Sequence, residues 1–206
     1  MSPHRRATLF AAARFLAVLM VLAAPWPGLG RAYVAAYGGV ATVIANPILA
    51  SSGVELALAP SAEDDAKHEW FAMVSVLDAQ THARQHKMAT DLRRAGYLQM
   101  ALYLAAAAAY PLRDRVRFLV VVTAGLALFA AFGWLPIMMY LAKKQIIALG
   151  SWSLSLLSVV YRSLVTPPGM AFAVPGLLWL AARTFLEKPS LPTAGRKIPA
   201  PSVSIV

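Results

Sequence analysis

The sequence predicts a mainly α-helical, polytopic membrane protein with about four transmembrane helices, interfacial helices and a small extracytoplasmic β-unit. Of its 206 residues, 59% are hydrophobic and only 14% are charged. The charged residues are clustered, and most of the basic ones flank long apolar runs. A soluble fold of this composition would leave large apolar surfaces in water, whereas a bilayer accepts them.

Long uncharged runs define the expected helices. A transmembrane helix needs roughly 20 apolar residues, with a range of about 17 to 25. The runs cover residues 15–30, 32–54, 95–112, 118–142, 145–161 and 163–182, and three of them reach that length without further argument. The remaining runs are judged by their flanks and by their periodicity.

Residues 1–30 predict an N-terminal transmembrane anchor. Arg5 and Arg6 precede an apolar stretch that ends at Trp26, set between two prolines as in an interfacial exit. A cleaved signal peptide shares the basic start and the apolar core, and it stays the alternative. The anchor is favoured because no clear small-x-small cleavage site precedes Arg31.

Residues 31–54 predict an interfacial helix on the outer surface. The segment is long enough to cross the bilayer, but it is rich in Ala and Gly and contains Pro47. Its larger side chains recur at helical spacing: Tyr33, Tyr37, Val40, Ile44 and Ile48. An amphipathic helix in the interface explains this pattern better than a second crossing, which stays the alternative.

Residues 55–94 predict a small extracytoplasmic domain with two or three β-strands. Seven of the nine acidic residues of the chain fall in this segment. Apolar residues alternate from Val54 onward, residues 70–77 form a compact β-prone run, and residues 78–80 suit a turn.

Residues 95–112 and 118–142 predict two transmembrane helices joined by a cytoplasmic basic loop at 113–117. Short cytoplasmic loops carry an excess of Lys and Arg. The topology markers in this loop are Arg113, Arg115 and Arg117. They place residues 55–94 on the opposite side of the membrane.

Residues 144–166 predict an amphipathic helix. Lys144, Ser151, Ser155, Ser158 and Arg162 recur at spacings of three, four and seven on one face. The helix either lies in the outer interface, which is favoured, or crosses the membrane with its serines against a partner. The candidates for partner interaction are Ser151, Ser155, Ser158 and Arg162.

Residues 168–188 predict the last transmembrane helix, kinked at Pro175, and residues 189–206 predict a disordered tail. The ends assigned to the cytoplasm carry more Arg and Lys residues than the short segments assigned to the outer side. The distribution predicts a multi-pass protein of the inner membrane with cytoplasmic N- and C-termini.

No catalytic constellation and no cofactor site are predicted. The chain has no cysteine, which excludes disulfides, thiolate metal sites and a cysteine nucleophile. No serine lies in a Gly-x-Ser-x-Gly motif, and no histidine falls near the helices to act as a base. The net charge of +10 comes from short anchoring clusters without stacking aromatics, which disfavours nucleic-acid binding.

Polar residues within the apolar runs are few, which disfavours a stand-alone carrier or pump. Gln99 and Thr123 are the central polar groups of their runs, and we expect them to form hydrogen bonds between helices. Outside the runs, His82 and His86 stand four apart and form a weak metal-site hypothesis, with Asp91 or His68 as further ligands. Solvated surface histidines are the favoured interpretation, so no metal is predicted.

The order of these pieces resembles the exosortase H-associated membrane proteins. The octapeptide Asp-Leu-Arg-Arg-Ala-Gly-Tyr-Leu at 91–98 opens a helix after an outer β-unit that contains Trp70. The segment Tyr-Pro-Leu-Arg-Asp-Arg at 110–115 closes that helix with a proline and a basic loop. The likeness covers most of residues 10–186.

This resemblance implies a non-catalytic accessory protein in a bacterial envelope system that sorts proteins with a C-terminal membrane tail. The implied partner is an exosortase-like membrane transpeptidase with a cysteine nucleophile, which this chain lacks. A membrane subunit of a transporter or permease complex is the alternative function. A metal-binding membrane protein that uses His82 and His86 is a third hypothesis.

Overall fold

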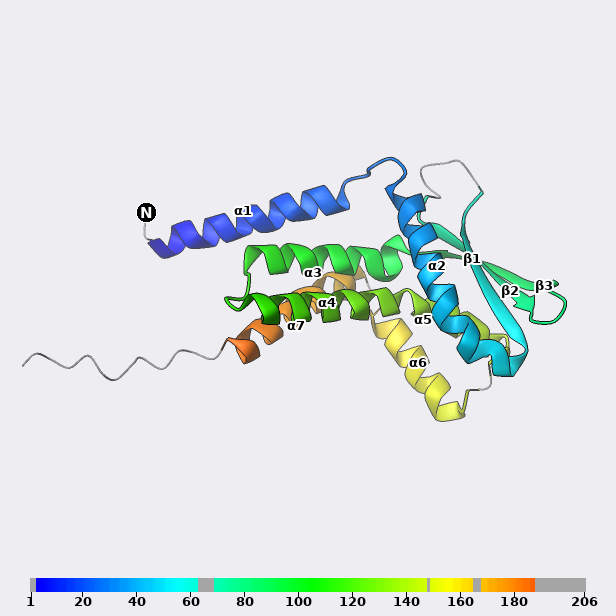
Figure 1. The fold of residues 1–206 in the computed structure, drawn as a ribbon. Coiled ribbons are helices and arrows are strands. Elements are labelled where there is room, and N and C mark those ends of the chain that lie inside the picture. The colour runs from blue at the N-terminus through cyan, green and yellow to red at the C-terminus, as the bar shows by residue number, and fades with distance from the viewer. Residues whose placement is uncertain (1–2, 63–68, 148, 165–167, 188–206) are drawn as a thin grey trace, which may run out of the picture.

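The computed structural model describes residues 3–62, 69–147, 149–164 and 168–187 of the chain (Figure 1). The predicted tail at 189–206 and His68 lie outside the described residues. The helices are α1 (Pro3–Ala23), α2 (Leu29–Leu49), α3 (Leu98–Ala109), α4 (Arg115–Phe132), α5 (Trp134–Lys143), α6 (Ser151–Leu164) and α7 (Pro168–Leu186). The strands are β1 (Val54–Pro60), β2 (Phe71–Asp78) and β3 (Arg84–Asp91).

The prediction of a mainly helical chain with apolar helices and a small β-unit is confirmed. Among the described residues, three helical stretches are long and apolar enough to cross a membrane: Arg5–Ala23, Leu29–Ser52 and Arg115–Lys143, the last comprising α4 and α5. Two of these stretches belong to the four predicted transmembrane helices, and the third is α2, which was expected to lie in the interface. Of the other two predicted helices, α3 has only 12 residues and is too short for a span of roughly 20, whereas α7 has 19 residues.

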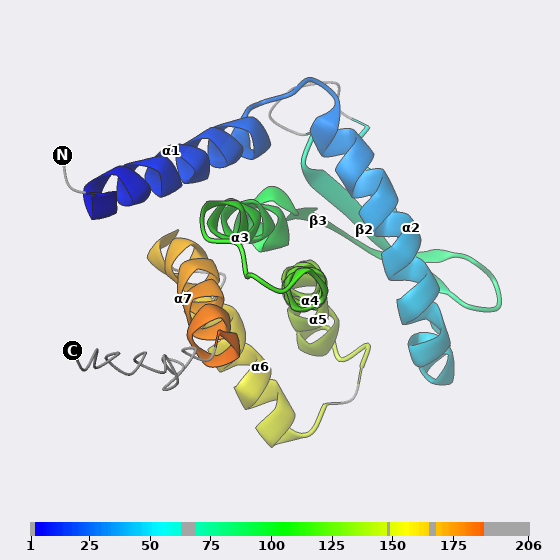
Figure 2. The same ribbon diagram turned by 60° about the vertical axis from the view of Figure 1, so that its left-hand side comes forward.

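Helix α3 lies at the centre of a bundle with α1, α4 and α7, and the four run side by side (Figure 2). Its alanine-rich sequence lets the neighbouring helices approach closely, and most of its residues are buried. Tyr103 of α3 packs between Phe129 of α4 and Trp179 of α7, with ring centroids 5.5 and 5.4 Å apart. Gly125 of α4 lies directly beneath the Tyr103 ring, where any Cβ would overlap it.

A short π-helical turn, η2 (Arg93–Tyr97), connects the sheet to α3. Gly96 has φ +123°, which only glycine adopts readily, and a Cβ there would lie 2.6 Å from the Phe129 carbonyl oxygen. Gln99 stabilises the turn: its Oε1 accepts from Gly96 N–H at 2.9 Å, and its Nε2 donates to the Arg94 carbonyl at 2.9 Å. The expectation that Gln99 bonds to another helix is wrong, because its side-chain amide bonds to the backbone of the turn that precedes its own helix.

The three strands form one antiparallel sheet in the order β1–β2–β3. Its inner face carries Leu56, Val74 and Val76, which are covered by α2 and α5. Ile137 and Leu141 of α5 complete this core and are fully buried. Since α5 continues α4, the same helical rod belongs to the bundle at one end and supports the sheet at the other (Figure 1).

Helix α2 lies across β1 rather than alongside the bundle (Figure 1). Gly38 permits the contact, because a Cβ there would come 2.9 Å from the Leu58 carbonyl oxygen. On the face of α2 that the sequence predicted to be apolar, Val40, Ile44 and Ile48 are exposed, as is Val43. Tyr33 and Tyr37, expected on that same face, instead pack in an aromatic cluster with Trp70 and Tyr97.

The sheet and the basic loop lie at opposite ends of the molecule. The start of α1, the connection from α3 to α4 and the end of α7 meet at one end, and the sheet lies at the other (Figure 1). The markers Arg113, Arg115 and Arg117 therefore share their end with Arg183 of the last turn of α7. Asp114 caps α4 there, accepting from the N–H groups of Val116 and Arg117 at 2.9 and 3.3 Å.

Candidate partner-binding surface

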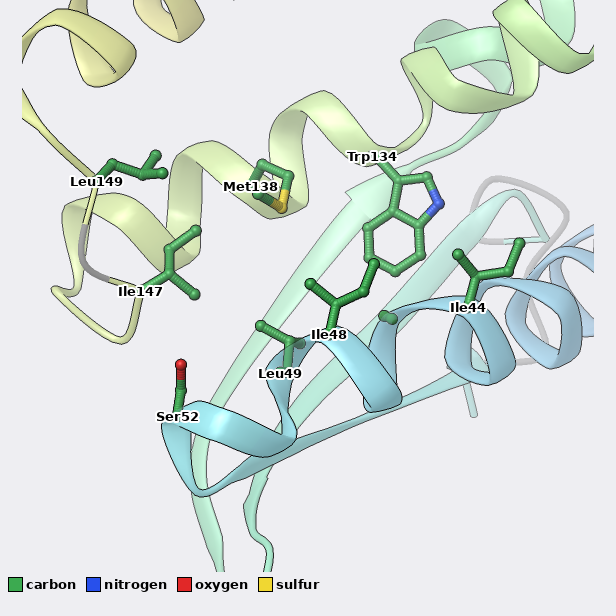
Figure 3. Close-up of a pocket in the computed structure, with 9 residues that line it drawn as sticks. Ile44, Ile48, Leu49, Ser52, Trp134, Met138, Ile147 and Leu149 are labelled. Carbon is green, nitrogen blue, oxygen red and sulfur yellow. The ribbon is translucent and has the colours of Figure 1, made fainter.

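A cavity of about 380 Å³ opens between α2, α5 and the segment that follows α5 (Figure 3). Apart from Ser52, the side chains that line it are apolar. Trp134 and Met138 of α5 face Ile44 and Ile48 of α2 across the opening. Without a charged or titratable side chain in its lining, the cavity suits an apolar segment and offers no acid, base or nucleophile.

Both helices that form the walls of this cavity pack on the sheet beneath them. Trp134 and Met138 lie one helical turn apart on α5, beside the buried Ile137 and Leu141 that anchor α5 to the sheet. On the other wall, Ala45 and Leu49 of α2 are buried in the same core. A hollow framed by two anchored helices is formed before any ligand arrives.

The third wall of the cavity is the segment that follows α5, and here the predicted helix over 144–166 is wrong at its start. Helix α6 begins only at Ser151, and Lys144 lies in the turn before it, off the serine-bearing helix. The reason is that Gln145 has φ +57°, a left-handed conformation that ends α5. Gly150 then starts the new helix, its carbonyl accepting from Leu154 N–H at 3.0 Å.

This turn brings Ile147 and Leu149 to the cavity and joins it to a second one. The adjoining cavity, about 430 Å³, shares Ile147 and Leu149, reaches Leu154 of α6 and is also lined by Lys143 and Gln145. We call the two together the apolar groove, defined by Ile44, Ile48, Trp134, Met138, Ile147, Leu149 and Leu154. Apolar surface therefore continues from α2 across the turn to α6.

Helix α6 exposes large apolar side chains as well as its serines. Trp152 is 76% exposed, and Leu156 and Val159 are also exposed. The predicted partner residues Ser151, Ser155, Ser158 and Arg162 all lie on this helix. Ser158 is half-buried and the other three are exposed, so the predicted face remains accessible for contact.

The two histidines of the metal hypothesis, His82 and His86, lie in different elements, one in a turn and one in a strand. His82 lies in the turn between β2 and β3, with φ +53° and its Nδ1 3.2 Å from Glu55 Oε2. His86 is on β3, with its ring 6.4 Å from that of Tyr140. Among the described residues, no group of three or more His, Cys, Asp or Glu side chains lies close enough to hold a metal ion.

Sequence reasoning found α6 but missed the apolar groove. A partial signal is present, since Ile44 and Ile48, and likewise Trp134 and Met138, are spaced one helical turn apart. Nothing in the sequence shows that these two pairs face each other, because their distance is set by the sheet on which both helices pack.

Comparison of the chain with protein families, with curated proteins and with solved structures gave no match.

Proposed function

We propose that this chain is a non-catalytic integral membrane accessory protein that holds a membrane-embedded partner against the apolar groove and α6. The partner proposed from the sequence resemblance is an exosortase-like membrane transpeptidase of a bacterial envelope protein-sorting system. The first cavity of the groove has no charged or titratable side chain in its lining, and Lys143 and Gln145 line only the second, which supports binding rather than chemistry.

The proposed arrangement in the bacterial inner membrane has α1, α3, α4 and α7 in the bilayer. The basic end, with both termini, lies in the cytoplasm according to the excess of Arg and Lys there. The stretch Arg115–Lys143 has 29 residues, or about 44 Å of helix, which exceeds the roughly 30 Å hydrocarbon core. Helix α5 then projects outward with the sheet, and α2 and α6 lie at the outer interface beside the groove.

The observation that carries the proposal is a preformed hollow rimmed by exposed apolar side chains. Ile48 on one rim is 70% exposed, and Trp152 on α6 is 76% exposed. A helix that faces only lipid needs no hollow, because fluid acyl chains fit a smooth surface. A hollow of this size between two helices that pack on the sheet suits the side chains of a complementary protein surface, such as a partner helix.

Site-specific crosslinking tests the proposal. A photoreactive phenylalanine analogue is placed at Ile48, at Trp152, or at Leu119, which is 63% exposed on α4 and serves as the lipid-facing control. After irradiation of native membranes, we expect positions 48 and 152 to capture a transpeptidase identified by mass spectrometry, and position 119 to capture none. Equal capture from all three positions, or no capture from 48 and 152, contradicts the proposal.

The serine face is tested separately by affinity co-purification. Replacing Ser151, Ser155 and Ser158 with leucine is expected to lower recovery of the transpeptidase several-fold. Ser153→Leu is the matched control, because Ser153 is an exposed serine of the same helix outside the 151–155–158 face. Unchanged recovery with the triple variant removes the serine face from the interface.

The same capture distinguishes the alternative function. Recovery of an ATPase and a solute-binding protein in place of a transpeptidase identifies a transporter or permease complex.

The orientation in the membrane is tested with single cysteines at Gln80 and Arg115, since the chain has no cysteine of its own. We expect a membrane-impermeant maleimide to label position 80 in intact spheroplasts and position 115 only after lysis.

A further inference from the structure

The two edges of the sheet differ in a way that the apolar groove does not explain. A three-stranded sheet has two edge strands, here β1 and β3, and each presents a row of backbone N–H and C=O groups to its surroundings. Natural proteins usually block such edges because they pair with other chains.

The edge of β1 is blocked by α2. Asn46 of α2 accepts a hydrogen bond from the Leu56 N–H at 2.9 Å and donates one to the Leu56 carbonyl at 3.3 Å. One step along the edge, Gly38 packs against the Leu58 carbonyl. Pro60 has no N–H to offer, so no strand can pair along β1.

The edge of β3 is open. The Leu92 N–H donates to the Trp70 carbonyl at 3.0 Å, whereas the Phe71 carbonyl turns to the other side and accepts from Ser61 N–H at 3.0 Å. Continuing this alternation through the register, the backbone groups of Lys87 and Ala89 are directed away from β2. Within the described part of the chain, no further strand pairs with β3.

A third cavity, of about 440 Å³, runs along this open edge. Met88, Ala89 and Thr90 of β3 form one side, and Tyr140 of α5 and Tyr161 of α6 form the other. There is thus space for an extended segment beside the strand, with aromatic side chains opposite.

The charges around the open edge are mainly positive. Exposed Arg84 and Lys87 lie on β3, and exposed Arg94 and Lys143 border the cavity. Asp91, the carboxylate among the described residues that line this cavity, is already engaged, with Oδ2 3.4 Å from Arg94 Nε and Oδ1 accepting from the Arg93 N–H at 2.9 Å.

We propose that the edge of β3 binds an extended acidic peptide segment of a protein by adding it as a fourth strand. Ladder hydrogen bonds from Lys87 and Ala89 supply the binding. Carboxylates on either face of the added strand meet a cation, because Arg84 and Lys87 lie on one face of the sheet and Lys143 lies on the other. Anionic lipid headgroups would meet the same cations, but they cannot use a row of backbone groups at strand spacing. This site adjoins the apolar groove at Lys143 but uses other surfaces, and it stands whether or not the proposed function does.

The test uses the full chain in phosphatidylcholine nanodiscs, with acetylated and amidated (Val-Glu)4 as the probe. We expect saturable binding, and slower hydrogen exchange of the Lys87 and Ala89 amides when the peptide is bound. A (Val-Lys)4 peptide, and a (Val-Glu)4 peptide N-methylated at alternate residues, are both expected to bind at least about tenfold more weakly. Equal binding of the N-methylated peptide overturns strand addition.

A protein variant gives an independent result. Ala89→Pro removes an N–H that is directed away from β2, so the sheet keeps its ladder while peptide affinity falls at least about tenfold. Ala89→Ser keeps the N–H and is the matched control, with affinity expected within about twofold of the native chain. If Ala89→Pro unfolds the protein, the N-methylated peptide still decides the question.

One outcome assigns the site to lipid instead. Short-chain phosphatidylglycerol is titrated in place of the peptide, and the same amides are followed. If it slows the exchange of Lys87 and Ala89 while (Val-Glu)4 does not, the edge is a lipid site and the proposal is wrong.

Discussion

The side-chain amide of Asn46 pairs with the backbone of Leu56 as a neighbouring strand would. Its oxygen accepts from the Leu56 N–H at 2.9 Å, and its nitrogen donates to the Leu56 carbonyl at 3.3 Å. One helical side chain thus attaches α2 to the sheet and closes the edge of β1. Because α2 is also a wall of the apolar groove, this contact connects the stability of the sheet with the shape of the groove.

Asn46→Ala is expected to destabilise the protein by about 1–3 kcal/mol, because the backbone N–H and carbonyl of the buried Leu56 lose their partner. Thermal unfolding in detergent, followed by tryptophan fluorescence, measures the change. Thr42→Ala is the control on the same helix. Its hydroxyl bonds to the Gly38 carbonyl at 2.9 Å within α2, and its loss should cost less than about 0.5 kcal/mol. Equal effects of the two variants contradict this role of Asn46.

Gln99→Leu is expected to destabilise the bundle by about 2–3 kcal/mol. Gln99 is only 2% exposed, and the leucine leaves the Gly96 N–H and the Arg94 carbonyl without their partner in apolar surroundings. The same unfolding assay applies, with Met100→Leu as a volume-conserving control at the next residue. A Gln99→Leu variant as stable as the control would show that the turn does not depend on this amide.

Two glycines on apolar helices should respond to alanine in opposite directions. Gly125→Ala places a methyl group into the Tyr103 ring, so we expect a loss of about 1–3 kcal/mol from overpacking between α3 and α4. Gly39→Ala on α2 meets no atom within 4 Å and should stabilise its helix by up to about 1 kcal/mol. Melting temperatures that shift in the same direction for both variants would contradict this packing.

The turn between β2 and β3 should weaken in acid. Hydrogen bonds from the Thr81 N–H and hydroxyl and from the Gln80 N–H hold the pKa of Asp78 below its ordinary value of 3.8. A carboxyl with a lowered folded-state pKa contributes stability above its unfolded pKa, and that stability is lost as the pH falls through the folded value. Exchange of the Thr81 amide should therefore be slow near neutral pH and relatively less protected below about pH 4. Asp78→Asn should remove this pH dependence; persistence of the effect would assign it to another group.

Some parts of this fold were predictable because they depend on local sequence. The uncharged runs predicted that helices lie near α1, α4 and α7, although the ends of these helices differ from those of the runs, and the sheet follows from β-prone stretches around a turn at Asp78. Ser151, Ser155, Ser158 and Arg162 share α6 as their spacing predicted. Other features were not predictable from local patterns. Gln145 adopts a positive φ that ends the helix expected from residue 144, and Gln99 bonds to its own turn rather than to a neighbouring helix.

By itself, the sequence determined which segments are apolar enough for a bilayer, where the basic residues gather and that a small sheet interrupts the helices. These properties arise from transfer free energies and backbone preferences, which each segment carries alone. Only the tertiary structure decided that α2 lies on β1, that Ile48 faces Trp134 across a hollow and that β3 keeps an open edge. Such features depend on which surfaces of distant segments meet, and no single segment contains that information.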